Sequence, residues 1–364
     1  MAKKAVLIMG AGHIGVVMAC MLADTRKYKV YLADHKIDTF DLKALGDQKK
    51  HITLLKLAAQ DPSSIAQIIQ DNKITALISC LPYYCNVKMA KVAKDENCHY
   101  FDLTEDVEVT KYVGQLAKFA DKAFVPQCGV APGFISIVAH DIMQTFDEVD
   151  TVLLRVGGLP ENPNNALKYA LTWSTEGLLN EYANTCYGLF EGKIIPLMPL
   201  EGLETIEIDG LLYEAFNTSG GLGTLAHTHE KKVNNMTYKT LRYPGHCEKM
   251  RFLMNDLKLN EDREILKCIL EKAIPRTLQD VVVMYVAIKG YREGALMEET
   301  FVKKFWPKEV AGQTRSALQI STAASACAVV DMVLSSPAKY KGFVKQESFP
   351  LKDVRESFFG HYYD

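Results

Sequence analysis

The sequence predicts an α/β protein with two parts: a doubly wound parallel sheet and a second α/β unit built on a mixed, largely antiparallel sheet. Three observations support this fold class. Apolar strand patterns alternate with helix patterns over the first 128 residues. A glycine-rich turn follows the first of these strands. After Phe134 the alternation ends, and short turn signals such as Glu-Gly-Lys and Ile-Asp-Gly separate the strand patterns.

Six strands are expected in the first part. They lie at residues 5–9, 30–34, 52–57, 74–80, 99–103 and 123–127. Helix patterns lie between most of them, for example at 85–96 and 107–121. Strands joined by helical crossovers form a doubly wound parallel sheet, and such sheets bind ligands at the carboxyl ends of their strands. The irregular segments that follow these strands are therefore candidate sites.

The first strand runs into a Gly-x-Gly-x-x-Gly turn and then an apolar helix, which together predict a Rossmann dinucleotide-binding unit. The first glycine permits the tight turn, the second leaves room for a pyrophosphate, and the third lets the helix pack on the strand. The pyrophosphate is expected at the helix N-terminus, where free N–H groups favour an anion. A tight turn without a ligand is the alternative. The cofactor-binding residues expected here are Gly10, Gly12, His13 (through its backbone N–H), Ile14 and Gly15.

The second strand ends in Asp34, a position that favours NAD over NADP. A carboxylate there accepts hydrogen bonds from the ribose hydroxyls and repels a 2′-phosphate. The next residues, His35 and Lys36, are cationic candidates for contact with a 2′-phosphate, or ordinary solvated loop charges. NAD is therefore the expected cofactor and NADP the less favoured one.

The second part begins with a helix at 134–146 and a strand at 149–157. Further strands are expected at 168–173, 184–195, 203–208, 236–243, 280–290 and 298–306, with helices at 175–183, 245–257 and 262–273. A long apolar helix at 313–334 is expected to pack back on the nucleotide domain. We therefore expect an NAD-binding domain of residues 1–130 with 312–335, a substrate-binding and dimerisation domain of residues 131–311, and a tail of residues 336–364 with no role assigned.

The composition argues against two classes of binding partner. The chain has 364 residues, a net charge of −2 and no block rich in lysine or arginine, so neither nucleic acid nor a membrane surface is an expected partner. No stretch of about 18 uninterrupted apolar residues predicts a membrane span. Lys3-Lys4 and the apolar run after it imitate a signal peptide, but that run contains the glycine turn and continues into the second strand.

Cysteine usage bears on redox compartment and metal content. Nine cysteines occur without a Cys-x-x-Cys pair, and several, such as Cys20, Cys80 and Cys327, lie in apolar segments. Buried thiols without disulfides are typical of a reducing cytoplasm, where we expect this protein, and they argue against structural zinc.

Four motifs in order carry a family resemblance: Ser79-Cys-Leu-Pro82, Gln127-Cys-Gly-Val-Ala-Pro-Gly133, Trp173-Ser-x-x-Gly177 and Thr240-Leu-Arg-Tyr-Pro-Gly-His246. They resemble the saccharopine dehydrogenase superfamily over residues 1 to about 335. The resemblance implies a Rossmann domain, an α/β substrate domain and a homodimer formed through the second domain. Cofactor contacts are expected in the segments that follow the parallel strands, at His35, Ser79, Cys80, Leu81, Pro82, Tyr84, Gly129 and Pro132, and the resemblance also places the cofactor near Tyr84.

Two branches of that superfamily compete. Glutamate-forming saccharopine reductases typically carry Asp where this chain has Ala131, and Arg in the Trp-Ser motif where this chain has Glu176. Both departures resemble the lysine 6-dehydrogenase branch. That branch commonly has an Arg in the segment before Thr224, which is absent from Ser219-Gly-Gly-Leu-Gly here.

Oxidation of an amine to an imine requires a neutral amine, hence a base and a group that holds the substrate cation. Asp102, at the end of the fifth strand, is a candidate to orient the ammonium or to act through water, or else a helix cap. Glu176 is a candidate cation-binding carboxylate, with a favourable helix-start charge as the alternative. His227 is a candidate base, and Tyr243 completes the catalytic candidates.

The candidate substrate-binding residues are Trp173, Arg242 and His246. Arg242 is suited to clamp a carboxylate, since guanidinium groups bind carboxylates through two parallel hydrogen bonds. Trp173 would form a wall of the pocket, and the rigid Pro-Gly step would aim His246. His227 and His229 alternate, but no partner stands at a zinc-ligand spacing, so no metal is expected.

The sequence therefore predicts an NAD-dependent oxidoreductase acting on the amine of lysine or of a lysine-derived amino acid. The alternative is a saccharopine dehydrogenase or reductase, which forms or cleaves a lysine–glutamate C–N link. A third hypothesis is an NAD-binding regulatory protein without turnover.

Overall fold

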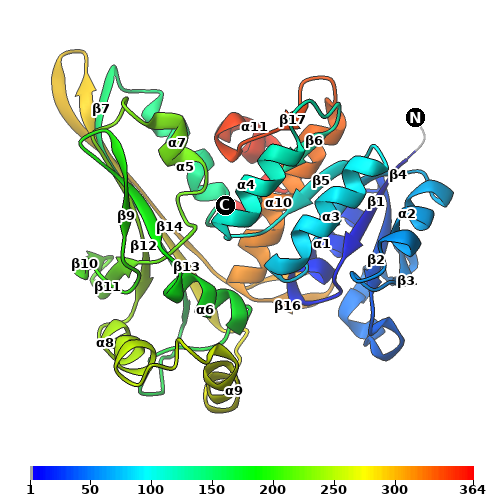
Figure 1. Cartoon of the computed structure of the whole chain (residues 1–364), viewed down its shortest axis with the longest axis horizontal. Helices are drawn as coiled ribbons and strands as arrows, with labels where there is room; N and C mark the ends of the chain where they lie inside the picture. Colours follow the sequence, from blue (N-terminus) through cyan, green and yellow to red (C-terminus); the bar gives the residue numbers. More distant parts are fainter. Residues whose placement is uncertain (1–2) are drawn as a thin grey trace. The chain divides into compact units, whose positions relative to one another are not determined.

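The computed structural model describes residues 3–364, which form two compact units (Figure 1). The first unit contains the chain up to Phe134 together with Lys308–Arg315 and Gln319–Asp364. The second unit contains Ile135–Pro307 and Ser316–Leu318. The chain therefore leaves the first unit after Phe134 and returns to it at Lys308, apart from the short segment Ser316–Leu318.

The first unit is built on a seven-stranded parallel sheet with strand order β17-β6-β5-β4-β1-β2-β3. The predicted Rossmann sheet is confirmed. Its strands are β1 (Lys4–Met9), β2 (Tyr28–Asp34), β3 (Ile52–Lys56), β4 (Ile74–Ser79), β5 (His99–Asp102), β6 (Ala123–Val125) and β17 (Gly342–Phe343). Strands β2 and β4 flank β1, so the order reverses there, and doubly wound sheets bind ligands outside such a reversal.

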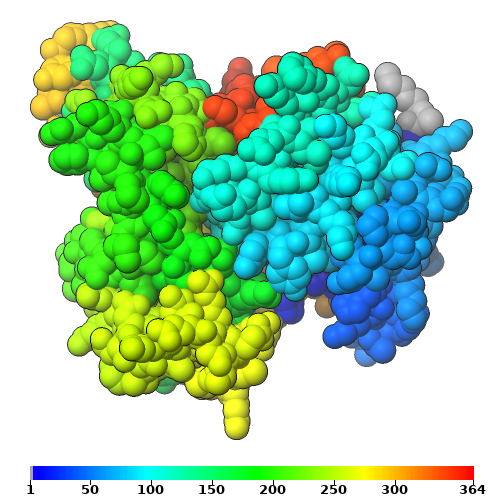
Figure 2. Space-filling view, viewed as in Figure 1, coloured from blue at the N-terminus to red at the C-terminus, as the bar shows by residue number. Residues whose placement is uncertain are grey.

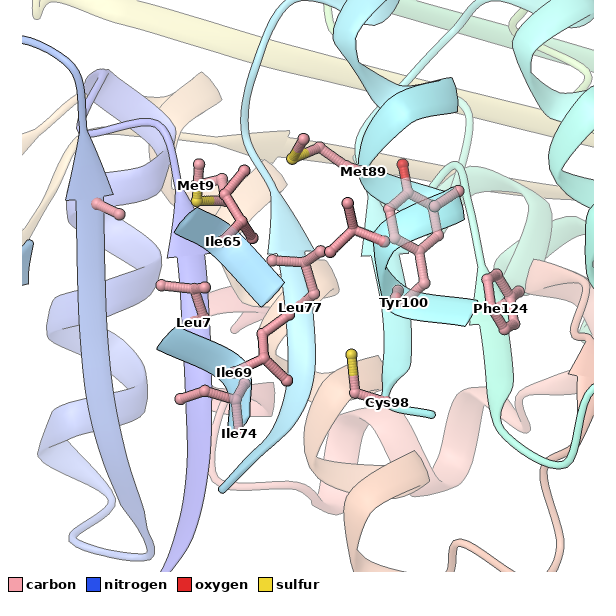
Figure 3. Close-up of a cluster of buried hydrophobic side chains, with 14 of the residues drawn as sticks. Leu7, Met9, Ile65, Ile69, Ile74, Leu77, Met89, Cys98, Tyr100 and Phe124 are labelled. Carbon is pink, nitrogen blue, oxygen red and sulfur yellow. The ribbon is translucent and has the colours of Figure 1, made fainter. Parts of the chain in front are cut away.

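Helices cover this sheet because its strands are apolar on both faces. The packing helices are α1 (His13–Asp24), α2 (Pro62–Asp71), α3 (Tyr83–Asp95) and α4 (Val107–Leu116), with 3₁₀ segments at Ile37–Thr39 and Leu42–His51. Figure 3 shows one side of the core, where Ile65 and Ile69 of α2 and Met89 of α3 pack over Leu77 and Tyr100 of the sheet. This packing holds the carboxyl ends of β1, β4 and β5 in place.

The apolar helix α10 (Ala317–Ser335) starts later than predicted, because Gln313–Arg315 forms β16 and pairs with β15 (Lys308–Val310). Within residues 3–364 it is the one helix long and apolar enough to cross a membrane, but 83% of its most apolar window is buried inside the structure. Most of it belongs to the first unit, where Lys27 and Tyr28 bind Asp331 at 3.1 and 2.5 Å. Its burial is that of a core helix.

The tail beyond α10 also belongs to the first unit. It contributes β17, a 3₁₀ turn at Gln346–Ser348, helix α11 (Leu351–Glu356) and a final 3₁₀ turn at Gly360–Tyr363. Apolar side chains bury it: Tyr340, Val344, Phe349, Val354, Phe359, Tyr362 and Tyr363. The segment with no role assigned from the sequence thus completes the first unit.

The second unit holds an eight-stranded sheet with the main order β10-β11-β12-β7-β13-β14, and β8 and β9 attach through β12. One pair, β7 with β12, is parallel and the other pairs are antiparallel, so the predicted mixed sheet is confirmed. The strands are β7 (Glu148–Pro160), β8 (Cys186–Phe190), β9 (Lys193–Leu197), β10 (Glu204–Ile208), β11 (Leu211–Asn217), β12 (Asn235–Arg242), β13 (Asp280–Arg292) and β14 (Ala295–Phe305).

Three details of the second unit differ from the prediction. The expected strand at 168–173 is wrong: the side chain of Asn165 bonds to the backbone of Tyr169 and shapes a turn there instead. The expected strand at 184–195 is a hairpin of β8 and β9. Strand β11 was not predicted. The helices are α5 (Phe134–Met143), α6 (Thr175–Ala183), α7 (Leu225–His229), α8 (His246–Arg251), a π-helical turn at Phe252–Asp256, and α9 (Arg263–Ala273).

Candidate functional site

The glycine turn after β1 has the geometry that a dinucleotide requires. Gly10 has a φ of 105°, and a Cβ there would lie 2.8 Å from the carbonyl oxygen of Cys80. A Cβ at Gly15 would lie 1.9 Å from the carbonyl oxygen of Gly10. A Cβ at Gly12 would meet no atom within 4 Å. Two glycines are therefore needed for packing, while Gly12 borders open space beside the N-terminus of α1.

The carboxylate of Asp34 joins the end of β2 to this turn. Its Oδ2 accepts a hydrogen bond from the backbone N–H of Ala11 at 2.9 Å. Its Oδ1 accepts one from Lys36 N at 2.9 Å and lies 3.1 Å from Nδ1 of His35. A carboxylate acceptor beside the glycine turn fits the ribose hydroxyls of a nicotinamide dinucleotide, whose pyrophosphate would lie at the N-terminus of α1. His35 adds a neighbour that is cationic when protonated.

The segment after β4 lines the same turn mainly through its backbone. Leu81 Cδ2 would lie 3.4 Å from a Cβ on Gly10, and Tyr84 is 58% exposed on the first turn of α3, just after Pro82. The side chain of Ser79, a predicted cofactor contact, is buried and donates to Oδ1 of Asn86 at 2.7 Å. Burial raises the pKa of the Cys80 thiol to about 12, so this sulfur is not a thiolate nucleophile.

The segment after β6, residues 126–134, forms a tight loop that precedes α5. We call it the 126–134 loop. The backbone N–H of Phe134 donates to the carbonyl oxygen of Gly129 at 2.9 Å. A Cβ on Gly133 would lie 2.0 Å from that same oxygen. Gly129 and Pro132, both predicted cofactor contacts, lie within this loop at the carboxyl end of the parallel sheet.

Asp102 is fully buried, contrary to the expectation of a carboxylate facing a ligand. Its Oδ1 accepts hydrogen bonds from the N–H groups of Thr104 and Gln127 at 3.0 and 3.1 Å, and its Oδ2 accepts one from Tyr100 at 2.8 Å. Burial raises its pKa to about 6. The carboxylate ties β5 to the 126–134 loop, and this geometry favours a structural role over a catalytic one.

In the second unit, Arg242 and His246 are brought together with two tyrosines. The guanidinium Nε of Arg242 donates to the hydroxyl of Tyr182 at 2.8 Å. That hydroxyl lies 3.1 Å from Nε2 of His246, whose Nδ1 lies 2.8 Å from the carbonyl oxygen of Leu167. The guanidinium carbon also lies 5.0 Å from the ring centre of Tyr169, a cation–π contact.

The proton positions in this cluster follow from its geometry. The carbonyl of Leu167 can only accept, so Nδ1 of His246 carries the hydrogen and Nε2 accepts from Tyr182. Burial and the nearby charge of Arg242 lower the pKa of His246 to about 3. His246 is therefore neutral at neutral pH with both ring nitrogens occupied, which suits positioning rather than proton transfer.

A residue that the sequence analysis missed, Glu214, fixes the Pro-Gly-His turn. Its two oxygens accept hydrogen bonds from the backbone N–H groups of Gly245 at 2.8 Å and Cys247 at 2.5 Å. A carboxylate at a helix start is favourable, and here it caps α8 from strand β11. No local signal in the sequence links Glu214 to this turn, because 31 residues separate it from Gly245.

The Trp-Ser-x-x-Gly motif has a local structural explanation. The Oγ of Ser174 accepts from the N–H of Gly177 at 3.2 Å and caps α6. A Cβ on Gly177 would lie 2.5 Å from the ring of Trp173, so the glycine makes room for the indole. The indole N–H donates to the hydroxyl of Tyr169 at 3.1 Å, which places Trp173 beside the Arg242 cluster. Glu176 lies 3.7 Å from Nζ of Lys267 on α9.

Two further catalytic candidates lie away from this cluster. The hydroxyl of Tyr243 donates to the carbonyl oxygen of Pro160 at 2.9 Å, and burial raises its pKa to about 12. Its ring stacks on Tyr213 in a separate apolar cluster, so Tyr243 is a packing residue. His227 is exposed on the short helix α7. His229 instead lies 3.2 Å from a ring nitrogen of His140, and residues 3–364 hold no cluster of three metal ligands.

Comparison with known proteins identifies the family. A family model described as "Saccharopine dehydrogenase NADP binding domain" matches residues 6–127, and one described as "Saccharopine dehydrogenase C-terminal domain" matches residues 129–361. The chain belongs to the saccharopine dehydrogenase family. The predicted superfamily is thus confirmed, whereas nothing in the comparisons singles out its lysine 6-dehydrogenase branch.

Two similar proteins illustrate the relationship within the family. The saccharopine dehydrogenase (NADP(+), L-glutamate-forming) of Pyricularia oryzae is 24% identical over 285 residues, covering 76% of this chain and 62% of its own length. The mitochondrial alpha-aminoadipic semialdehyde synthase of Bos taurus is 21% identical over 322 residues, covering 83% of this chain and 33% of its own. The chain therefore spans less than two thirds of the length of either relative.

Solved structures show the same fold. The apo saccharopine dehydrogenase (L-Glu forming) of Saccharomyces cerevisiae aligns with a TM-score of 0.75 at 18% identity, over 97% of this chain and 96% of that one. A homospermidine synthase from Legionella pneumophila, solved in complex with NAD, aligns with a TM-score of 0.62 at 12% identity, over 100% of this chain and 90% of that one. The family fold thus accounts for both units.

Proposed function

We propose that this protein is a nicotinamide-dependent oxidoreductase that acts on the C–N bond of lysine or of a lysine-derived amino acid. The observation that carries the proposal is that the chain holds both a dinucleotide-binding turn, in the first unit, and a buried cationic cluster around Arg242, in the second. The names of the relatives support this class of reaction, because saccharopine is itself a lysine-derived secondary amine.

The buried positive charge of Arg242 supports the proposal that the substrate is an amino acid. Arg242 is 3% exposed, and the buried carboxylate of Glu181 and the hydroxyl groups of Tyr182 and Tyr169 act on its charge. Burial of a cation is costly, and a bound substrate carboxylate would add to the groups that offset this cost. We infer that Arg242 binds the α-carboxylate of the substrate, while Tyr182, His246 and Glu214 hold the guanidinium and its turn in place.

A bound nicotinamide would supply the hydride acceptor or donor; the chain would supply orientation. Gly10, Gly12, Gly15 and Asp34 would hold the dinucleotide. Trp173 and Tyr169 would provide apolar walls beside the carboxylate site, which would orient the C–N bond of the substrate and exclude water. If Arg242 holds the α-carboxylate of the substrate, the length of the side chain decides how far its amine lies from Arg242. A single cation can therefore select an amino acid of defined length.

Saccharopine is the first candidate substrate, because relatives with this name match both units. Lysine is the second, and specific residues favour it: Ala131 and Glu176 stand where glutamate-forming enzymes typically carry Asp and Arg. The loss of an Arg removes one counter-charge for a second carboxylate. The smaller substrate therefore fits the charge of the second unit better, whereas the comparisons favour the larger one.

For the cofactor we propose NAD. The carboxylate of Asp34 repels a 2′-phosphate and is held toward the turn by Ala11. NADP stands as the alternative, supported by the relatives that are named for it and by the neighbouring His35.

The decisive experiment offers the purified protein L-lysine or saccharopine with NAD or NADP and follows the near-ultraviolet absorbance of the reduced nicotinamide. Turnover with one of the two amino acids is expected. Cofactor binding by calorimetry with no turnover of either amino acid would refute the enzyme proposal and favour a regulatory NAD-binding protein.

We also propose a homodimer formed through the second unit. Strand β14 is an edge of the sheet, and the β13–β14 hairpin exposes the apolar side chains of Tyr291, Leu296, Met297 and Val302. Figure 2 shows the turn of this hairpin (gold) at the outer edge of the view. Exposed apolar edges of this kind pair with another chain, and a second copy offers a matching edge.

A further inference from the structure

The C-terminal tail contacts the 126–134 loop through a glutamine. The side-chain Nε2 of Gln346 donates to the carbonyl oxygen of Pro126 at 2.8 Å and lies 3.3 Å from Sγ of Cys128. Gln346 is 2% exposed. Strand β17 brings it there, since Val344 N donates to the carbonyl oxygen of Phe124 in β6 at 3.0 Å. One end of the loop is therefore fixed by the tail.

The other end of the loop is fixed by a tyrosine of the tail. The ring of Tyr363 stacks on Phe134 with centroids 3.9 Å apart and planes inclined by 14°. Its hydroxyl donates to the carbonyl oxygen of Ser321 in α10 at 2.6 Å. Both rings are buried. Tyr363 thus clamps Phe134, the last residue of the loop, against the first unit.

The rest of the first unit supports the loop as well: the backbone N–H of Cys128 donates to the carbonyl oxygen of Asp102 at 2.9 Å. Asp102 bonds to Gln127 near its start, and the Gly129–Gly133 and Gly129–Phe134 contacts are internal to it. The loop lies at the carboxyl end of β6, on the edge where a doubly wound sheet binds its ligand. Its conformation therefore decides part of the shape of that edge.

We propose that Gln346 and Tyr363 are positioning residues of the cofactor site, which hold the 126–134 loop in the conformation that receives the nicotinamide end of the dinucleotide. This inference rests on the proposed function, since it requires that a dinucleotide binds at this edge. The tail then acts as a part of the nucleotide site rather than as an appendage.

The test measures dissociation constants of NADH and NADPH by cofactor fluorescence. Tyr363→Ala removes the ring stack and is expected to weaken binding of the preferred cofactor roughly tenfold, the upper range for an aromatic pair. Tyr363→Phe keeps the stack and is expected to restore binding to within about threefold. Gln346→Met keeps the volume but removes both polar contacts, and is expected to weaken binding about fivefold.

The matched control is Phe358→Ala, which removes another aromatic ring of the tail that is 42% exposed and packs against Phe359 and His361. Thermal melting and circular dichroism check that each variant is folded. If Tyr363→Ala is unfolded, Gln346→Met carries the test. Folded Tyr363→Ala or Gln346→Met proteins that bind cofactor as tightly as the wild type overturn the inference alone. A wild-type protein that binds neither cofactor overturns the proposed function as well.

Discussion

Arg242 is the residue on which the substrate proposal depends. Truncating a buried charge that binds an opposite charge typically costs 2–5 kcal/mol. We therefore expect Arg242→Gln to lower kcat/KM by about 30-fold or more, mainly through KM, with partial rescue by Arg242→Lys. Steady-state kinetics with the active amino acid measure this.

Arg251→Gln is the matched control for Arg242, because Arg251 is an exposed cation of α8 paired with Glu201 at 3.0 Å. Its kinetic constants should stay close to those of the wild type. An Arg242→Gln protein that is folded and retains the wild-type KM would show that the substrate carboxylate binds elsewhere.

Asp34 is the residue on which the proposed preference for NAD over NADP depends. Removing its carboxylate in Asp34→Ala removes the acceptor for Ala11 and the repulsion of a 2′-phosphate. We expect weaker NAD binding and a smaller preference for NAD over NADP, measured as the ratio of the two dissociation constants. Asp38→Ala, an exposed carboxylate paired with Lys56, is the control. An unchanged ratio in Asp34→Ala would exclude Asp34 as the ribose ligand.

Asp102 gives a pH dependence of stability. Its pKa is raised from 3.8 to about 6 in the folded protein, so the folded state holds its proton more tightly than the unfolded state. The contribution of the Asp102 carboxyl group to the free energy of unfolding is then largest at low pH and falls as the pH rises toward 6. The loss between pH 5 and pH 7.5 should be about 1–2 kcal/mol from this group. Urea unfolding should show a smaller loss in Asp102→Asn; an equal loss would contradict the assignment.

At the scale of elements, different glycines of the turn after β1 serve packing and cofactor binding. A methyl group at Gly15 meets the backbone of Gly10, whereas one at Gly12 enters open space. We expect Gly12→Ala to melt within about 2 °C of the wild type yet to bind cofactor at least tenfold more weakly, because the methyl group occupies the pyrophosphate space. Gly15→Ala should lower the melting temperature instead. Tight cofactor binding by Gly12→Ala would place the pyrophosphate elsewhere.

The same elements show what the sequence could predict. The strands of the parallel sheet are short apolar runs between helices, so their pattern is visible without tertiary information. Strand β17 has only two residues, Gly342 and Phe343, which pair with β6. So short a strand leaves no hydrophobic pattern from which it could be predicted. The burial of Asp102 could not be predicted from the sequence, because strand-end carboxylates point either to solvent or to the next loop, and only the fold decides between them.

Side-chain direction explains why Arg242 and Tyr243 have different surroundings within one motif. Arg242 and Tyr243 are neighbours at the end of β12, so they face opposite sides of the sheet. Arg242 joins Tyr182 and His246, while Tyr243 packs on Tyr213. The motif was recognisable in the sequence, but its division between a polar cluster and an apolar core depends on the faces that the sheet buries.

At the scale of the whole molecule, the exposed β13–β14 hairpin predicts self-association. Light scattering coupled to gel filtration should give about twice the chain mass of 40.7 kDa. Introducing Leu296→Glu with Met297→Glu should shift the mass toward the monomer, because like charges at an apolar contact prevent its burial. Leu42→Glu, at an exposed apolar position of the first unit, should leave the mass unchanged. A monomeric wild type would refute the dimer.

The pairing of β17 with β6 has a consequence for synthesis. Gly342 pairs with Ala123, so more than 200 residues are translated between two neighbouring strands of one sheet. While those residues emerge from the ribosome, the edge of β6 has no partner strand and the 126–134 loop has no clamp. Folding of the first unit can therefore finish only after the second unit has been made, which gives β6 a long exposure to other chains.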